Sequence, residues 1–130
     1  EIGTGSGYQT AVLSSIAAAV YSVEKIAPLA QAAAGRLEKL GYENAHVRHA
    51  DGYEGWPEEA PFDAIMVTAA PPQFPDILAH QLAIGGRMIV PVGPPFEPQT
   101  LYLCSKSDTG ALTKKKVLPV AFVPMVESQK

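Results

Sequence analysis

Glycine occupies alternate positions at the start of the sequence, at Gly3, Gly5 and Gly7 of the segment EIGTGSGY. The glycine backbone reaches conformations that are closed to other residues, and a ligand can approach the main chain where no Cβ stands in its way. The helix expected after this loop adds unpaired N–H donors and the positive end of a helix dipole. This pattern predicts a loop that binds a small ligand through its backbone.

An acidic residue follows the loop at the end of the next apolar run. Residues 20–23 are rich in strand-forming side chains, and Glu24 closes the run, roughly 20 residues after the first glycine. In a Rossmann-like unit, an acid at that place accepts hydrogen bonds from ribose hydroxyls. The loop and the acid together predict a cofactor that carries a nucleoside.

Details of the loop decide between nucleoside cofactors. Tyr8 stands three places after Gly5, where a dinucleotide fingerprint needs a third small residue, so a nicotinamide cofactor is disfavoured. No Gly-Lys followed by Ser or Thr comes after the loop, which excludes a phosphate-binding P-loop. A cofactor without phosphates, whose amino-acid part lies along the loop, fits these glycines. S-adenosyl-L-methionine is such a molecule.

Helices and strands alternate in the segments that must position these residues. The hydrophobic pattern predicts helices at residues 11–19, 29–40 and 76–82, with Gly85 and Gly86 ending the third. Strands are expected at residues 20–23, 45–48, 62–68, 87–92, 99–105 and 116–123. The last two form an antiparallel hairpin around a turn at 107–110. This order predicts an α/β fold with a mostly parallel sheet and an antiparallel edge, in a single domain over residues 1–130.

The composition excludes several classes of partner. Of the 130 residues, 47% are hydrophobic and 18% are charged, and the net charge of −3 gives no footprint for nucleic acid. The one basic run, at residues 114–116, is expected to be a solvated face rather than a contact for an acidic partner. No apolar run reaches the roughly 20 residues of a membrane-spanning helix, so no membrane partner is expected.

A few isolated residues indicate whether disulfides, a metal site or a lid over a ligand are expected. Cys104 is the only cysteine, so no intramolecular disulfide can form, and we expect an inert core residue and a cytoplasmic location. The histidines, His46, His49 and His80, lack the spacing of metal ligands, so no metal site is expected. Trp56 is interpreted either as a lid over a ligand or as a surface residue that packs on its own domain.

Further motifs narrow the assignment to one family. The loop at residues 1–9 is accompanied by ADG at 50–52, GWPEEAPFDAI at 55–65, VTAA at 67–70 and GGRMIVPVG at 85–93. Together these segments resemble the protein-L-isoaspartate O-methyltransferases. The glycine loop alone is shared by the whole superfamily of S-adenosylmethionine-dependent enzymes, whereas the tryptophan loop combined with the proline-valine-glycine strand end is much narrower. The resemblance covers nearly the whole chain and implies a Rossmann-like three-layer sandwich.

The resemblance implies a cofactor site spread over several segments. The glycines of the loop would lie along the methionine part, and Glu24 would hold the ribose diol through two charge-assisted hydrogen bonds. Asp51 and Gly52 would meet the adenine, whose edge presents both donors and acceptors. The full implied cofactor-binding set is Glu1, Gly3, Thr4, Gly5, Ser6, Gly7, Glu24, Lys25, Asp51 and Gly52.

The resemblance also implies the reaction. S-adenosyl-L-methionine would give its methyl group to the free carboxylate of an L-isoaspartyl residue in a damaged peptide or protein, leaving S-adenosyl-L-homocysteine and using no metal. That carboxylate, with a pKa of about 4, is already ionised at neutral pH, so no base has to remove a proton. The methyl ester would then collapse to a succinimide, a route back to aspartate. Thr68, Ala69 and Ala70, at the carboxyl end of a strand, are the expected substrate-binding residues.

The chain departs from the family pattern at its start. Family members carry an N-terminal segment with a Thr-Ile-Ser pattern, which includes a serine at the reacting centre, and an apolar first strand; residues 1–130 contain neither. We therefore expect the first strand to be largely missing and turnover by residues 1–130 to be weak or absent. A catalytically impaired fragment or binding module, and a small-molecule methyltransferase of the same superfamily, stay open as alternatives. The oligomeric state is left open.

Overall fold

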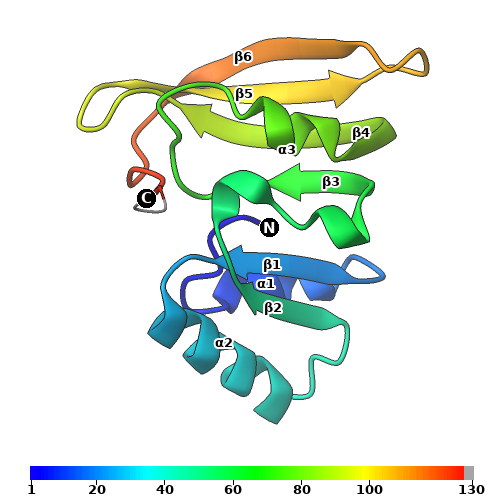
Figure 1. The fold of residues 1–130 in the computed structure, drawn as a ribbon, viewed down its shortest axis with the longest axis vertical. Coiled ribbons are helices and arrows are strands. Elements are labelled where there is room, and N and C mark those ends of the chain that lie inside the picture. Colours follow the sequence, from blue (N-terminus) through cyan, green and yellow to red (C-terminus); the bar gives the residue numbers. More distant parts are fainter. Residues whose placement is uncertain (128–130) are drawn as a thin grey trace.

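The computed structural model describes residues 1–127, which alternate between helices and strands (Figure 1). In chain order the elements are α1 (Tyr8–Ser14), β1 (Val20–Glu24), α2 (Ala27–Lys39), β2 (Ala45–His49), the short 3-10 turns η1 (Gly52–Glu54) and η2 (Pro57–Glu59), β3 (Phe62–Met66), α3 (Asp76–His80), β4 (Leu82–Val92), β5 (Gln99–Lys106) and β6 (Leu112–Val120). The alternation confirms the predicted α/β class.

The strands form two sheets that meet at one residue. β1 and β2 pair in parallel, and a four-stranded sheet has the order β3-β4-β5-β6. Within it β3 and β4 are parallel, whereas β4 with β5 and β5 with β6 are antiparallel, so the expected hairpin is confirmed. Ile2 joins the sheets through parallel bridges to Val23 in β1 and to Val67 just after β3. In Figure 1 the start of the ribbon accordingly lies between β1 and β3.

The first helix begins and ends earlier than predicted. α1 ends at Ser14 rather than at residue 19, because the Ser14 hydroxyl donates to the carbonyl of Ala11 (2.7 Å) and competes with continuation of the helix. The side-chain amide of Asn44 then donates to the carbonyl of Ser14, which the helix end leaves open, and to the carbonyls of Ala17 and Ala18 in the segment that follows. A side chain distant in sequence therefore closes this helix, which a local pattern does not reveal.

The second helix matches its prediction. α2 has Pro28 in its first turn, where a missing N–H costs no hydrogen bond, and it carries Arg36 and Lys39 in its last turn, near the negative end of its dipole. Its buried residues, Ala30, Ala33 and Leu37, recur at helical spacing and pack inward. Among residues 1–127, no helix combines the length and the apolarity that crossing a membrane requires.

The boundary between α3 and β4 differs from the prediction. α3 ends at His80 and β4 starts at Leu82, so Gly85 and Gly86 lie within the strand and do not end the helix. Phe62 pairs with Leu82 and Ala64 pairs with Arg87, which leaves residues 83–86 as a bulge in β4. The two glycines therefore mark an irregularity of the sheet.

The end of the hairpin also differs from the prediction. β6 covers Leu112–Val120, whereas the sequence pattern predicted residues 116–123. The side chain of Gln99 binds both backbone groups of Phe122, accepting from its N–H (2.6 Å) and donating to its carbonyl (2.9 Å). Val123 bonds to Ala70 instead of continuing the ladder. These contacts turn the chain out of the hairpin before residue 123.

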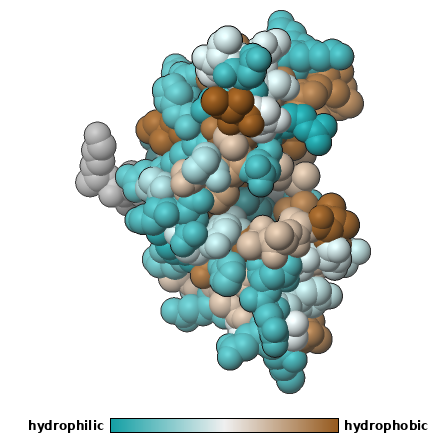
Figure 2. Space-filling view, turned by 90° about the vertical axis from the view of Figure 1, so that its right-hand side faces the viewer, coloured by the Kyte–Doolittle hydropathy of each residue, from teal (hydrophilic) through white to brown (hydrophobic). Residues whose placement is uncertain are grey.

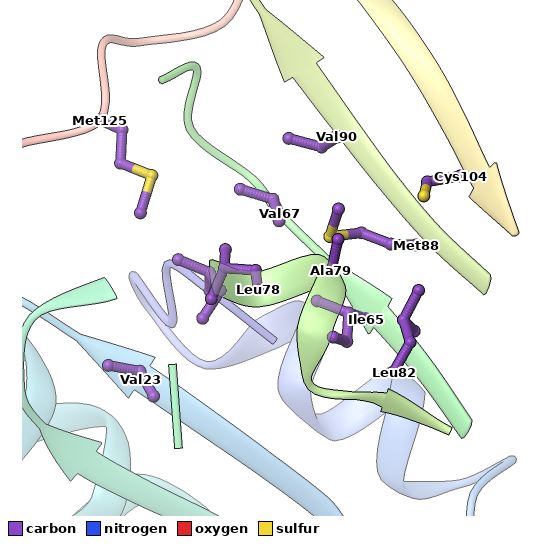
Figure 3. Packing of buried hydrophobic residues seen from close by; sticks show 11 residues of the cluster. Val23, Ile65, Val67, Leu78, Ala79, Leu82, Met88, Val90, Cys104 and Met125 are labelled. Atoms are coloured by element: carbon purple, nitrogen blue, oxygen red, sulfur yellow. The ribbon is translucent and has the colours of Figure 1, made fainter. Parts of the chain in front are cut away.

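The core lies between α3 and the four-stranded sheet (Figure 3). Leu78 and Ala79 of α3 face Met88 and Val90 of β4, and all four side chains are fully or almost fully buried. Cys104 of β5 belongs to the same cluster with no exposed surface, which confirms that it is a core residue. This cluster fixes the strands whose carboxyl ends carry the candidate site.

Candidate functional site

A cavity of about 320 Å³ opens where β1 and β3 end. Ligands of open α/β sheets collect at this edge, outside the carboxyl ends of the strands. The volume falls within the range of about 300–1,000 Å³ typical of small-molecule sites. The cavity is lined by Ile2, Gly3, Gly5, Val23, Glu24, Lys25, Ile26, Leu29, Gly52, Thr68, Ala69, Val123, Pro124, Met125 and Val126.

The cavity brings together residues predicted from separate parts of the sequence. Its wall contains the predicted cofactor residues Gly3, Gly5, Glu24, Lys25 and Gly52, and the predicted substrate residues Thr68 and Ala69. The remaining predicted residues, Glu1, Thr4, Ser6, Gly7, Asp51 and Ala70, do not line this cavity. The first set converges on one space, and the second set surrounds it.

The buried hydroxyl of Thr4 attaches the glycine loop to β1. Gly3, Gly5 and Gly7 have φ angles of 96°, 56° and 87°, all in the left-handed region. Thr4 lies between them with its Oγ1 2.6 Å from the Oγ of Ser22 in β1, and both residues are buried. Thr4 thus anchors the loop to the strand beneath it.

Gly3 is packed against the end of β3. The Thr68 hydroxyl lies over the loop, donating toward the carbonyls of Ile2 (2.8 Å) and Gly3 (2.9 Å). A Cβ atom at residue 3 would collide with the Thr68 Oγ1. Only glycine fits at this contact, which locks the loop to the strand that carries the predicted substrate residues.

Glu24 ties the loop to the end of β1. Its side chain is only 7% exposed, and its Oε1 accepts from the Gly5 N–H (2.8 Å) while its Oε2 accepts from the Ile26 N–H (3.0 Å). A carboxylate has about four lone-pair sites, so two backbone bonds leave capacity for a ligand. The acid predicted from its position in the sequence is therefore also a structural brace of the loop.

Glu1 lies under the loop, away from the cavity. Its Oε1 accepts from the hydroxyls of Thr10 (2.5 Å) and Ser22 (2.7 Å). Its Oε2 is buried, and no group among residues 1–127 bonds to it. Buried oxygens normally accept a hydrogen bond, so one more donor at this oxygen would be favourable.

The predicted adenine segment starts the short turn η1. Asp51 caps this turn by accepting from the Tyr53 N–H (3.0 Å). Gly52 packs so closely that a Cβ there would lie 2.8 Å from the Ile2 Cγ2 and 2.9 Å from the Met125 Cε. Burial is the main cause that raises the pKa of the Tyr53 hydroxyl, so this side chain stays neutral beside the cavity.

Part of the cavity wall was not predicted from the sequence. Residues 123–126 form one side of the cavity, held by hydrogen bonds from the Ala70 N–H to Val123 O (2.8 Å) and from the Met125 N–H to Ala70 O (2.9 Å). The strand predicted at 116–123 placed Val123 in the sheet and not in a cavity wall. Pro124 could have indicated that the strand ends before it, because a proline has no N–H to continue a ladder.

Trp56 packs on its own chain. Its ring lies edge-on to Tyr21 with ring centroids 5.2 Å apart, and the guanidinium carbon of Arg48 stands 4.9 Å above its centroid. Trp56 does not line the 320 Å³ cavity, which favours the interpretation as a packing residue over that as a lid. Within residues 1–127, no three His, Cys, Asp or Glu side chains are placed to hold a metal ion.

Both the sequence and the structure of the chain are similar to those of known proteins. The profile of the family described as protein-L-isoaspartate(D-aspartate) O-methyltransferase matches residues 1–130. A protein-L-isoaspartate O-methyltransferase 1 of Nitrosospira multiformis is 57% identical over 125 residues, which are 96% of this chain and 53% of the relative. A protein-L-isoaspartate O-methyltransferase of Gloeobacter violaceus is 50% identical over 129 residues, covering 99% of this chain and 62% of the relative.

Solved structures show the same fold. A protein-L-isoaspartate O-methyltransferase superimposes with a TM-score of 0.86 and 35% identity, over 95% of this chain and 40% of that one. A Plasmodium falciparum protein, described as a beta-aspartate methyltransferase in complex with S-adenosyl-L-homocysteine, gives 0.79 and 26% over 98% of this chain and 64% of that one. These matches confirm the predicted Rossmann-like architecture. The chain spans about half the length of the curated relatives it matches.

Proposed function

The chain belongs to the protein-L-isoaspartate(D-aspartate) O-methyltransferase family, and on that premise we propose that it forms the cofactor-binding part of a protein-repair enzyme. The enzyme transfers a methyl group from S-adenosyl-L-methionine to the free carboxylate of L-isoaspartyl residues in damaged peptides and proteins. Residues 1–130 act as a single domain in this proposal. Because the relatives are longer, we assign turnover to the longer polypeptide and binding of the cofactor to this chain.

One observation carries the proposal. The cavity at the ends of β1 and β3 has the glycine loop, a buried acid and a closely packed glycine in its wall, from three separate segments. Glycine at these places lets a ligand approach the backbone, and the acid supplies charged acceptors. The Plasmodium falciparum protein of the same fold holds S-adenosyl-L-homocysteine. These features support a cofactor that carries a nucleoside and an amino acid.

In this proposal, different segments of the chain bind different parts of the cofactor. We assign the methionine part to the loop of residues 3–7 and the ribose hydroxyls to the lone pairs of Glu24 that Gly5 and Ile26 leave open. Asp51 and Gly52 are assigned to the adenine. Lys25 lines the cavity, whereas Glu1, Thr4, Ser6 and Gly7 lie outside its wall, and in this proposal they complete the cofactor-binding set around the loop.

The substrate is assigned to the strand end that faces the cofactor. Thr68 and Ala69 line the cavity, and Ala70 fixes the neighbouring wall through its two backbone bonds. The isoaspartyl carboxylate is ionised at neutral pH and needs no general base, so the chain has to align this oxygen with the reacting centre and exclude water from it. The cofactor supplies the methyl group. The serine that the resemblance places at the reacting centre is not assigned to any residue of this chain.

Composition supports a proposal about the compartment and the partners of the enzyme. A single cysteine favours a reducing compartment, and we place the protein in the cytoplasm. The net charge of −3 favours peptides and proteins over nucleic acid as partners. The family match disfavours a small-molecule methyltransferase and a binding module without chemistry.

Calorimetric titration of the chain with S-adenosyl-L-homocysteine tests the cofactor assignment. Glu24→Gln should weaken binding about ten- to hundredfold, because it removes a hydrogen bond to a charged group worth roughly 1.5–3 kcal/mol. The matched control is Glu38→Gln, which changes an exposed glutamate of α2 outside the cavity and should leave the affinity unchanged. A folded chain that binds no S-adenosyl-L-homocysteine would refute the assignment.

The reaction itself is tested on the full-length polypeptide. Transfer of a labelled methyl group to a peptide that contains one L-isoaspartyl residue should be rapid, and transfer to the same peptide with normal aspartate should be absent. Equal labelling of both peptides, or none, would contradict the substrate assignment and leave the cofactor result intact.

A further inference from the structure

The loop between β4 and β5 presents one aromatic side chain almost entirely to solvent. Phe96 is 97% exposed, and it is the middle residue of the segment PPFEP at residues 94–98. Exposure alone does not distinguish it, because hydrophobic residues are common on protein surfaces. Figure 2, which looks onto the amino ends of β1, β3 and β4, also shows separate brown hydrophobic groups among teal ones. What distinguishes Phe96 from such groups is its backbone.

Phe96 has a backbone conformation that favours glycine. Its φ angle is 61°, and among residues 1–127 every other residue with a positive φ is a glycine. A bulky side chain in this region is strained, and strained residues cluster at ligand clamps and other functional sites. Glycine would adopt the same conformation without strain, so phenylalanine contributes only its side chain at this position. The ring is therefore held in solvent at a cost to folding, which favours a role in binding.

The loop that carries the ring is rigid. Three of the five residues at 94–98 are prolines, whose rings fix φ at about −65°. The Glu97 N–H donates back to the Pro94 carbonyl (3.3 Å), which closes a turn around the phenylalanine. At the base of the loop, a Cβ on Gly93 would lie 2.9 Å from the Gln99 Cα, so the two ends of the loop are in close contact. A rigid loop loses little conformational entropy when its tip binds a ligand.

Both ends of the loop are attached to segments that belong to the cavity at the ends of β1 and β3. The Gly93 N–H donates to the carbonyl of Pro71 (3.0 Å), which directly follows the predicted substrate residues 68–70. The Gln99 side chain binds both backbone groups of Phe122, which directly precedes the C-terminal wall of the cavity. In Figure 1 the loop accordingly extends beyond the arrowhead of β4, at the edge where β1 and β3 also end.

We propose that Phe96 is a specificity-determining residue of the substrate site, where its ring packs against an apolar side chain that flanks the isoaspartyl residue of the bound peptide. This inference rests on the proposed function, which supplies the peptide substrate. Phe96 is three residues from Gly93, so at about 3.3–3.6 Å per residue it lies within roughly 10 Å of the base of the loop. An extended peptide bound at Thr68 and Ala69 covers a distance of that order with about three residues.

The chemistry of the loop favours an apolar partner. The ring of Phe96 has no hydrogen-bonding group, and the prolines beside it have no N–H to donate to a peptide backbone. Packing an apolar side chain on the ring removes apolar surface of both groups from water. A serine side chain gains little from the same contact. The structure therefore predicts that leucine near the isoaspartyl residue improves binding of the substrate.

Steady-state methylation by the full-length polypeptide tests the proposal. The substrates are peptides with one L-isoaspartyl residue in a serine background, in which a single leucine is moved through the three positions on either side. At one or more positions, leucine should lower KM about fivefold relative to the all-serine peptide. Phe96→Ala should abolish this advantage and leave kcat unchanged, because a contact remote from the reacting atoms stabilises substrate and transition state equally.

Three further variants separate a contact with the peptide from a structural role. Phe96→Leu keeps an apolar side chain and should retain most of the leucine advantage. Phe96→Gly removes the strain of the positive φ, so it should not lower the urea midpoint of unfolding, yet it should abolish the advantage. Ile84→Ala is the matched control, because Ile84 is 65% exposed in the bulge near the amino end of β4; it should change neither quantity.

Several results would overturn the proposal. A polypeptide that methylates all the peptides with the same KM would do so, as would a leucine advantage that persists in Phe96→Ala and Phe96→Gly. Equal loss of the advantage in Ile84→Ala would assign it to the stability of the sheet. Methylation of the all-serine peptide reports on the proposed function by itself. Its absence would refute that function and this inference together, whereas its presence without a leucine advantage would overturn this inference alone.

Discussion

The hydroxyl of Thr68 fills the space that a side chain on Gly3 would need, and it donates toward the carbonyl of Gly3 itself at 2.9 Å. This contact joins the glycine loop to the end of β3, so the two segments that carry the predicted cofactor and substrate residues hold each other in place. The conformation of the glycine loop and the position of the end of β3 therefore depend on each other.

Replacing Gly3 with alanine should lower the free energy of unfolding by about 2–4 kcal/mol, because the change adds a collision with Thr68 to the strain of a positive φ. Urea denaturation measures the loss. Gly110→Ala is the matched control, since Gly110 has a similar φ of 85° but open space around it. A Thr68→Ala change on top of Gly3→Ala should restore part of the loss; strict additivity would contradict the contact.

Replacing Glu24 with glutamine should also lower stability, by about 1–3 kcal/mol, because one of its two backbone donors then faces an amide N–H instead of an oxygen. Urea denaturation without ligand separates this effect from the loss of cofactor affinity. Glu38→Gln, on the exposed side of α2, is expected to change stability by less than about 0.5 kcal/mol. Equal stability of the two variants would mean that Glu24 is no brace of the loop.

Replacing Asn44 with alanine should lower the free energy of unfolding by about 1–3 kcal/mol, since its amide donates to the carbonyl of Ser14 at the end of α1 (2.8 Å) and to two carbonyls in the segment that follows. Asn44→Asp should be at least as harmful, because a carboxylate cannot donate to those carbonyls. Thermal denaturation of both variants checks this. A neutral aspartate variant would show that the amide bonds contribute nothing.

Cys104 should react slowly with thiol reagents until the chain unfolds. Its side chain has no exposed surface, and burial raises the pKa of its thiol, against a smaller opposing effect of Lys114. A raised pKa means that the unfolded chain releases the proton first, so the contribution of Cys104 to stability falls as pH rises above about 8.5.

Denaturation curves at pH 7 and pH 9.5 check the sign of this effect. The loss of stability between these pH values should be smaller for Cys104→Ala than for the unmodified chain. A larger loss in the alanine variant would contradict a raised pKa in the folded state.

Elements that depend on residues close together in the sequence were predicted correctly. The strand that ends at Glu24, the helix that starts near Pro28 and the turn at 107–110 follow from local patterns, and all three are present in the structure. Of the residues that converge on the cavity, the glycines of the loop and Glu24 were predicted from their spacing, whereas Lys25 and Gly52 were named through the family resemblance. Periodicity alone does not indicate which of them line it.

Several of the errors involve contact between distant segments. Asn44 holds the segment that follows α1, and β6 ends early because Gln99 binds both backbone groups of Phe122. The cavity wall at 123–126 exists because Ala70 pairs with it. Local propensity carries no record of such partners, so these boundaries could be found only in three dimensions.

The cavity takes one wall from Ile2 and another from Val126, which lie far apart in the sequence. The glycine loop, Glu24 and both sheets are formed by residues before 123, yet the cavity that the loop borders lacks a wall until residues 123–126 pair with Ala70. A polypeptide cut before residue 123 would keep the segments that form the loop, the acid and both sheets but not a closed pocket. Retention of a cofactor therefore depends on a contact that spans most of this domain, and not on the glycine loop by itself.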